Sequence, residues 1–176
     1  LGCAAVAILP EEMSRERFAW LREIGAEVVT TPGGEANVKE IFDKTRELLA
    51  SGGDGVVALN QFEEFGNARW HEAVTGPAMA EVFRTRARPG DRLAAVFLTQ
   101  DSAGTLACCD HLRREYPLVK VCAGEALQCP TLLENGHGAH RIEGIGDKHV
   151  PWILNARNLD LVAGIDDEAV VRLMRL

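Results

Sequence analysis

The sequence has no excess of basic residues. Its 19 Lys and Arg are outnumbered by 26 Asp and Glu, which gives a formal net charge of −7 at pH 7 and a pI near 5.3. Sequence-independent binding to nucleic acid needs a basic surface that displaces phosphate counterions, so this balance argues against that class of function. We therefore expect a small-molecule or protein partner and no nucleic acid.

Long apolar runs are also missing. The apolar residues 1–9 are too few to span a bilayer, and no basic segment precedes them, so they indicate a strand and neither a signal peptide nor a membrane anchor. The five cysteines form no C-x-x-C pair, and most of them lie among apolar or small residues. This pattern predicts buried thiols in a reducing cytoplasm.

Motifs of several common site classes are absent. Without a G-x-S-x-G elbow the chain does not fit a Ser–His–Asp hydrolase, and no G-x-G-x-x-G follows any strand, which disfavours a Rossmann-like nucleotide binder. His137 and His140 lie downstream of Cys122 and Cys129, but their spacing matches no common zinc site. We predict no metal.

What is present is an alternation of apolar runs and helical periodicity, with 47% hydrophobic and 26% charged residues. The predicted strands are 3–9, 27–31, 55–59, 93–98, 118–123 and 161–165, and the predicted helices are 14–24, 38–49, 67–83 and 105–116. This order predicts an α/β fold, a three-layer α/β/α arrangement with mainly parallel sheets. The polar connector 84–91 is the candidate boundary between two parts, 1–88 and 89–176.

The sharpest candidate site is the turn 99–105, between a buried strand and the first turn of a helix. Its small residues Ser102, Ala103, Gly104 and Thr105 let the backbone approach a ligand, and helix N–H groups with two hydroxyls can bind a phosphate. The alternative is a helix N-cap with tight packing. Asp101 opposes phosphate binding unless its carboxylate is turned away or neutralised.

Two further segments carry candidate residues. Gln61 follows a predicted strand, at the end where open α/β sheets bind ligands, and its amide can contact a substrate carboxylate or a cofactor oxygen; a loop-tying amide is the alternative. The stretch 141–151 contains Gly144, Ile145 and Gly146, whose backbone can line a ligand plane, and His149 or Lys148 can transfer protons. A solvated surface loop explains the same stretch.

Taken in order, several segments resemble the central half of cysteine-synthase-like fold-type II pyridoxal-phosphate (PLP) enzymes. They include PEEMSRERFAWLREIGAEVVTTPG, NQFEEFGNARWHEAVTGPAMAEV, SAGTLACCDHLRREYP and HRIEGIGDKHVPWILNARNLDLVAGIDDEAV. The resemblance covers nearly the whole chain, and the Q-F…N…H…T-G-P-A and H-R-I-x-G-I-G stretches are fairly specific together. It implies that 1–88 is part of a small mobile lobe and 89–176 part of the PLP-binding lobe.

The resemblance also implies roles for the candidate residues. Ser102, Ala103, Gly104 and Thr105 match the turn that holds the PLP phosphate, with Asp101 where the family usually has glycine. Gln61 matches a glutamine near the substrate. The backbone of Gly144, Ile145 and Gly146 matches the segment beside the cofactor ring. The implied parent protein is a homodimeric, PLP-dependent lyase or transferase that performs β-elimination or β-replacement on an amino acid.

Other parts of the family pattern have no counterpart. The lysine that binds PLP covalently and a Ser/Thr-Gly-Asn substrate loop belong upstream of Leu1, and the residue facing the pyridine nitrogen belongs downstream of Leu176. None of the four lysines has the family's lysine context, so we assign no catalytic residue and expect the isolated chain to be inactive: Lys39, Lys44, Lys120 and Lys148. The ends, Leu1 and a helical pattern at Leu176, favour an interior fragment.

Two alternatives fit the same sequence. A related PLP-dependent thiolase or ammonia-lyase subunit is the nearest variation, since the substrate-reading loop is not in view. A non-catalytic binding or assembly module, in which Asp101 abolishes phosphate binding, is the alternative from another class.

Overall fold

The computed structural model describes residues 2–34 and 37–176 and divides into two compact units, Leu1–Leu59 (unit 1) and Asn60–Leu176 (unit 2). Residues 60–88 therefore group with unit 2, whereas the connector 84–91 suggested a boundary after residue 88. The physical reason is that the helices of 65–86 pack against a later helix of unit 2. None of the described helices is long and apolar enough to cross a membrane.

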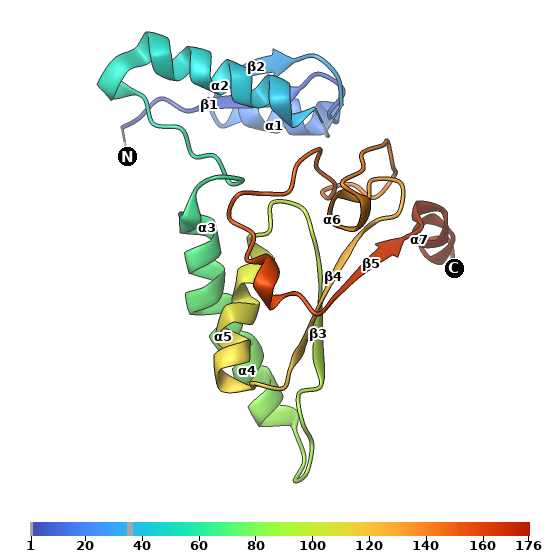
Figure 1. The fold of residues 1–176 in the computed structure, drawn as a ribbon. Helices are drawn as coiled ribbons and strands as arrows, with labels where there is room; N and C mark the ends of the chain where they lie inside the picture. The colour runs from blue at the N-terminus through green and yellow to red at the C-terminus, as the bar shows by residue number, and fades with distance from the viewer. Residues whose placement is uncertain (1, 35–36) are drawn as a thin grey trace. The chain divides into compact units, whose positions relative to one another are not determined.

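Unit 1 is built around a two-stranded parallel sheet (Figure 1). Its elements are β1 (Val6–Pro10), α1 (Arg15–Glu23), β2 (Glu27–Thr31), α2 (Val38–Gly52) and the 3₁₀ turn η1 (Gly53–Gly55). The predicted strand 55–59 is wrong: residues 56–59 are unpaired, and Val57 and Leu59 are 79% and 90% exposed. A β-branched run becomes a strand only beside a neighbouring strand, which the described residues do not offer it.

Unit 2 contains a three-stranded parallel sheet in the order β3-β4-β5. Its elements are α3 (Phe65–Trp70), the π-helical turn η2 (His71–Thr75), α4 (Gly76–Arg86), β3 (Ala95–Thr99), η3 (Thr105–Ala107), α5 (Cys108–Glu115), β4 (Lys120–Ala126), α6 (Thr131–Glu134), η4 (Ala156–Asn158), β5 (Leu161–Ile165) and α7 (Asp167–Leu173). Parallel pairing in both sheets confirms the predicted α/β class. The short helix α6 was not predicted.

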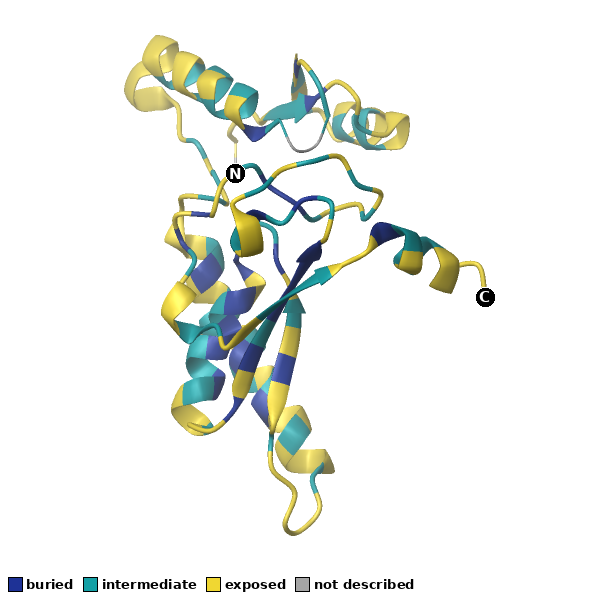
Figure 2. Ribbon diagram, turned by 45° about the vertical axis from the view of Figure 1, so that its right-hand side comes forward, coloured by how far each residue is buried: buried dark blue, intermediate teal, exposed yellow. Residues whose placement is uncertain are grey.

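The core of unit 2 lies between one face of this sheet and the helices α4 and α5 (Figure 2). Val96, Val121 and Ala123 point from the strands into this core, and Leu112 of α5 is fully buried against them. Alternate residues of a strand face opposite sides, so the odd-numbered residues of β3 lie on the other face. Cys108, Cys109 and Cys129 are buried, as predicted for most of the thiols, whereas Cys122 is half-buried and Cys3 is exposed.

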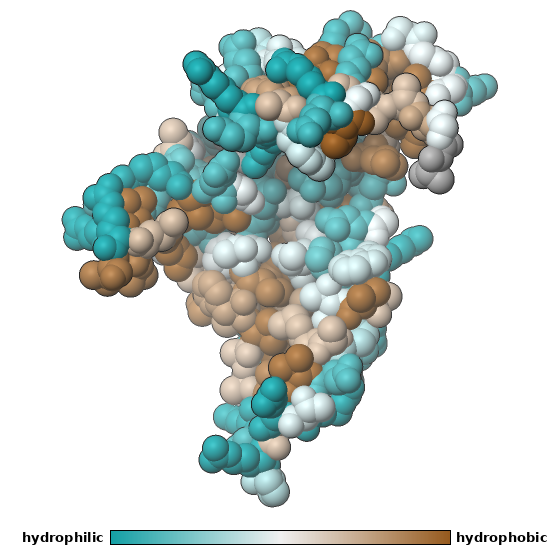
Figure 3. All heavy atoms as spheres, turned by 180° about the vertical axis from the view of Figure 1, so that it is seen from behind, coloured by the Kyte–Doolittle hydropathy of each residue, from teal (hydrophilic) through white to brown (hydrophobic). Residues whose placement is uncertain are grey.

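The opposite face of the sheet is apolar and open among the described residues. Phe97 and Leu161 share one cross-strand row through Cys122, and they are 54% and 55% exposed. In the view from behind, brown apolar surface gathers over the middle of unit 2 (Figure 3). The described residues therefore supply helices to one face of this sheet, two of the three predicted layers.

The helical stretch 65–86 is continuous but changes its winding at η2. Gly76 follows this turn and is buried. A Cβ added to Gly76 would lie 2.6 Å from the Cβ of His111 and 2.9 Å from the carbonyl oxygen of Cys108. Glycine thus allows the backbones of α4 and α5 to approach closely. The Gly76-Pro77 pair, which indicated an interruption, lies where the winding changes from η2 to α4, with proline in the first turn of α4.

Asp160 ties β4 to α5. Its carboxylate accepts the Val121 N–H (2.9 Å) and pairs with Lys120 (3.0 Å) and Arg113. The Val121 N–H and then the Lys120 side chain lower the pKa of Asp160 to about 2. A lowered carboxyl pKa stabilises the fold above the unfolded-state value, about 4, and this contribution is lost as the pH falls toward 2.

We therefore expect Asp160→Asn to remove part of the acid sensitivity of folding between about pH 4 and pH 2. Urea midpoints measured across this range will fall less steeply for Asp160→Asn than for the unaltered protein. Lys120→Gln is the matched control, because it keeps the Val121 hydrogen bond and will retain most of the slope. Parallel slopes for the unaltered protein and Asp160→Asn would contradict the assignment.

Candidate functional site

The candidate residues of unit 2 gather at one edge of its sheet. β3, β4 and β5 are parallel, so their carboxyl ends, at Thr99, Ala126 and Ile165, lie at the same edge. The turn after β3 is the predicted phosphate site, and the segment after β4 leads to Gly144. Ligands of open α/β sheets bind beyond the carboxyl ends of the strands, so this edge is the expected place for a site.

The turn 100–104 has a backbone suited to an anion. Ala103 has a left-handed φ of 64° and Gly104 follows with φ −56° and ψ −53°, the right-handed helical region. Successive N–H groups of such a pair converge and form an anion-binding concavity, here at the entry to η3 and α5. A non-glycine residue in the left-handed region is uncommon and strained, so the surrounding structure must hold this turn in its conformation.

Packing around Gly104 holds this concavity in place. A Cβ on Gly104 would lie 2.1 Å from Nδ2 of Asn67, so the amide of α3 rests directly on the glycine. Ala103 and Gly104 are buried, Ser102 is partly exposed and Thr105 is exposed, which leaves both hydroxyl-bearing residues within reach of a ligand. Asn67 belongs to the Q-F…N…H stretch, and the structure thus joins two of the motifs.

Two polar residues precede the concavity. Gln100 is 3% exposed, its N–H donates to the Gly124 carbonyl (2.7 Å), and its Oε1 lacks a hydrogen-bond partner among the described residues. Asp101 is partly buried and interacts with a neighbouring group. Buried polar atoms are normally hydrogen-bonded, so we expect Oε1 of Gln100 to accept a hydrogen bond from a donor outside the described residues.

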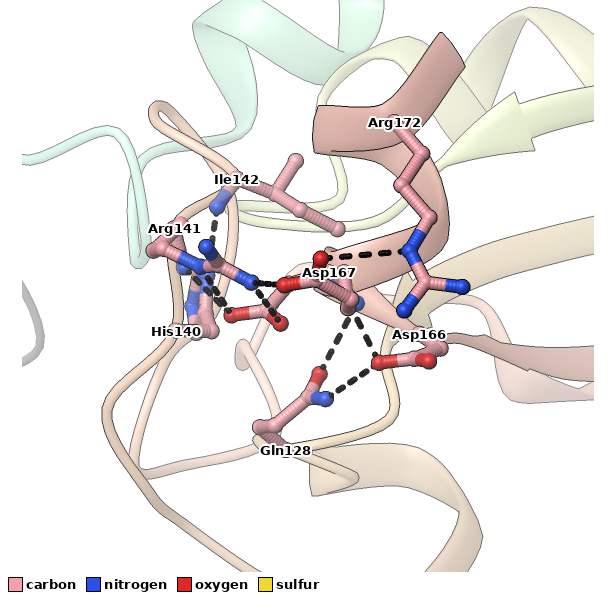
Figure 4. Close-up of polar contacts among 8 residues, drawn as sticks. Gln128, His140, Arg141, Ile142, Asp166, Asp167 and Arg172 are labelled. Atoms are coloured by element: carbon pink, nitrogen blue, oxygen red, sulfur yellow. Dashed lines mark hydrogen bonds and ion pairs between the residues drawn. The ribbon is translucent and has the colours of Figure 1, made fainter.

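The stretch 140–146 is tied to the same edge through Arg141 (Figure 4). The Arg141 N–H donates to Asp167 (2.9 Å), and its guanidinium pairs with Asp167 (3.2 Å) and Glu168 at the start of α7. These bonds raise the pKa of Arg141 and lower those of both carboxyls. Gln128 donates to Asp166 (2.8 Å) and accepts the Asp167 N–H (3.2 Å).

The glycines of this stretch have the backbone freedom expected of them. Gly144 and Gly146 have φ of 84° and 95°, and a Cβ on Gly146 would lie 2.2 Å from Nε2 of His140. Gly144 is exposed, Ile145 is half-buried and Gly146 is buried. The stretch is therefore a fixed loop at the sheet edge and not a freely solvated one.

A buried carboxyl follows these glycines. Asp147 is 2% exposed, its Oδ1 accepts the His149 N–H (3.3 Å), and its carbonyl oxygen accepts the Thr131 hydroxyl. Burial raises the pKa of Asp147, whereas burial and the nearby Lys148 lower the pKa of His137. In the described part of the chain, no group of three or more His, Cys, Asp and Glu side chains is placed to hold a metal ion.

Gln61 and the lysines occupy other positions. Gln61 is exposed in the turn before α3, six residues upstream of the Asn67 that contacts Gly104. Lys39 pairs with Asp43, Lys44 with Glu47 (2.7 Å), and Lys120 with Asp160. The residues of the turn fit a phosphate, and no lysine of the chain is assigned to bind the aldehyde of PLP.

Comparison with known proteins gives relatives of the same kind along the whole chain. The cysteine synthase of Staphylococcus aureus is 32% identical over 175 residues, which are 99% of this chain and 54% of the relative. The probable cysteine synthase of Bacillus subtilis is 30% identical over 168 residues, 95% of this chain and 52% of the relative. The chain spans about half the length of these curated relatives.

Solved structures agree with the fold. An O-ureido-L-serine synthase superposes with a TM-score of 0.83 at 25% identity, over 98% of this chain and 52% of the other. A hydrogen sulfide-producing enzyme from Fusobacterium nucleatum gives 0.85 at 22% identity, over 98% and 56%, a likeness of fold alone. The family described as "Pyridoxal-phosphate dependent enzyme" matches residues 1–176 throughout. Because this match runs from end to end, the chain belongs to the pyridoxal-phosphate dependent enzymes, with cysteine synthases among its relatives.

Proposed function

We propose that the chain forms the phosphate-anchoring part of a PLP-dependent lyase or transferase that acts on an amino acid by β-elimination or β-replacement. The observation that carries the proposal is the left-handed Ala103 followed by helical Gly104 at the end of β3, packed under Asn67. PLP, when bound, supplies an electron sink for deprotonation at the substrate Cα. The named relatives, cysteine synthases, support this reaction class.

In this proposal each candidate residue has a binding or positioning role. Ser102 and Thr105 donate hydroxyl hydrogen bonds to the phosphate, together with the backbone N–H groups of the turn. Gly144, Ile145 and Gly146 lie beside the cofactor ring, and the ion pairs of Arg141 hold that loop at the sheet edge. Gln61 orients the amino-acid substrate.

The larger organisation is part of the same proposal. Unit 1 corresponds to a small mobile lobe that excludes water on closure, and unit 2 to the cofactor lobe. The parent protein is proposed to be a cytoplasmic homodimer, and the free thiols of its five cysteines are consistent with that compartment. A PLP-dependent thiolase or ammonia-lyase subunit shares the anchor and differs in its substrate loop.

We expect the double variant Ser102→Ala/Thr105→Val to bind PLP at least about tenfold more weakly, because each hydroxyl bond to an anion contributes about 1.5–3 kcal/mol. PLP absorbance and displacement by inorganic phosphate measure this binding without any turnover. The matched control is Ser51→Ala/Thr85→Val, whose hydroxyls bond to carbonyls of their own helices.

The outcome can contradict the proposal in two ways. Equal PLP affinity in the double variant and the unaltered protein would place the phosphate elsewhere. Absence of any PLP binding, in the chain and in the longest polypeptide that contains it, would favour the non-catalytic module instead.

A further inference from the structure

A cavity of about 420 Å³ lies beside the phosphate turn, within unit 2. Its walls come from α3, from the segment 103–110 and from the segment 152–159. Ala68, Leu106, Val121 and Ile153 make an apolar floor, and each is less than 10% exposed. Phe65 and Trp152 stand at the rim, 48% and 81% exposed. The volume suits a small organic molecule, and most of its wall is apolar.

The cavity is lined by two charges that no opposite charge neutralises. Arg69 forms no ion pair with any residue that the structure describes, whereas the neighbouring Glu72 pairs with Arg114 (2.7 Å). Asp110 accepts hydrogen bonds from the amides of Asn155 (3.4 Å) and Asn158, which are uncharged donors. The cavity is thus lined by an exposed guanidinium and a half-buried carboxylate, neither of which pairs with an opposite charge among the described residues.

The two residues also have structural surroundings of their own. Asp110 lies in the first turn of α5, where it complements the helix dipole, and Arg69 lies near the junction of α3 with η2. The bonds from Asn155 and Asn158 also fix the segment 152–159 to α5. Neither use explains why both charges line one apolar cavity with exposed aromatic residues at its rim.

We infer that this cavity binds a free α-amino acid with an apolar side chain, at a site separate from the proposed catalytic one. The ligand's carboxylate pairs with Arg69, its ammonium group pairs with Asp110, and its side chain lies on the apolar floor below Trp152. A zwitterion is the small-molecule class that presents one charge of each sign beside an apolar body.

The cavity and the proposed phosphate turn share a residue. Ala103, the left-handed residue of the proposed phosphate anchor, is also part of the cavity wall. A ligand in the cavity contacts the turn from its packed side and favours one conformation of it, which makes the amino acid an effector of PLP binding. This coupling rests on the proposed function, whereas the binding itself does not.

The test uses isothermal titration of the PLP-free protein with three probes: L-phenylalanine, phenethylamine and 3-phenylpropionate. The last two lack the carboxylate and the ammonium group respectively. We expect L-phenylalanine to bind at least about tenfold more tightly than either, because the loss of one charge-assisted hydrogen bond lowers the affinity by at least that factor. Equal binding of all three probes, or no heat with L-phenylalanine, would overturn the inference.

Charge variants assign the two ends of the ligand. Arg69→Gln is expected to weaken L-phenylalanine at least tenfold and leave phenethylamine unchanged, and Asp110→Asn to weaken L-phenylalanine and leave 3-phenylpropionate unchanged. Arg92→Gln, an exposed arginine outside the cavity, is the control and keeps the affinity. Ala107→Leu fills the cavity and removes binding even if a charge variant folds poorly.

A substrate-site variant separates this inference from the proposed function. Gln61→Ala should leave L-phenylalanine binding unchanged; if it abolishes binding, the ligand occupies the proposed substrate site and the inference is wrong. If the protein binds no PLP but still binds L-phenylalanine through Arg69, the proposed function fails and this site stands.

Discussion

Replacing Leu112 by alanine is expected to lower the free energy of unfolding of unit 2 by about 3 kcal/mol. Leu112 of α5 is fully buried between the sheet and α4, where its loss leaves a cavity that the surrounding strands and helix cannot fill. Urea unfolding followed by tryptophan fluorescence measures the change. A Trp20→Phe background restricts the signal to unit 2, because Trp70 and Trp152 both lie there.

Leu118→Ala is the matched control for this measurement. Leu118 is 81% exposed, so the same chemical change should alter the stability by less than about 0.5 kcal/mol. A loss below about 1 kcal/mol for Leu112→Ala would mean that α5 is not packed on the sheet as described.

The second large effect concerns Gly146. We expect Gly146→Ala to destabilise unit 2 by about 2 kcal/mol or more, because its φ of 95° strains any L-residue and the new Cβ meets the His140 ring. Gly90→Ala isolates the first cause: its φ is 92°, but its Cβ meets no atom within 4 Å. The difference between the two variants in a urea titration measures the collision alone.

Removing the His140 ring tests whether it causes the collision with a Cβ on Gly146. In a His140→Ala background the extra cost of Gly146→Ala over Gly90→Ala should disappear, while the strain of the positive φ persists. An undiminished cost would show that the loop around Gly146 is constrained by something other than His140.

The sequence predicted best those elements whose environment is set by short-range pattern. The strands at 27–31 and 161–165 have their predicted bounds, because unbroken β-branched and apolar runs suit a parallel sheet. The run 55–59 has the same composition and yet remains unpaired. The difference lies in the neighbouring strand, which no local pattern reports.

The candidate site divides in the same way. Small residues after a buried strand predicted the turn 102–105. The left-handed conformation of Ala103 and the packing of Asn67 on Gly104 could not be predicted from the amino-acid sequence. Helix α6 was missed because its first N–H groups are held by Glu125, a buried carboxylate that accepts from Leu132 (2.9 Å) and Leu133 (3.0 Å). Such long-range partners appear only in three dimensions.

The π-helical turn η2 has a consequence for how this chain tolerates insertions and deletions. A π turn accommodates one residue more than the α-helical turn that it replaces. Deleting one residue from His71–Thr75 would let the stretch wind as a regular α-helix, and Gly76 and Ala80 would keep facing α5. Deleting one residue from the regular helix α4 would instead rotate the residues after it by about 100° about the helix axis. An alignment gap placed within this turn therefore preserves the helix phase that a gap in α4 would change.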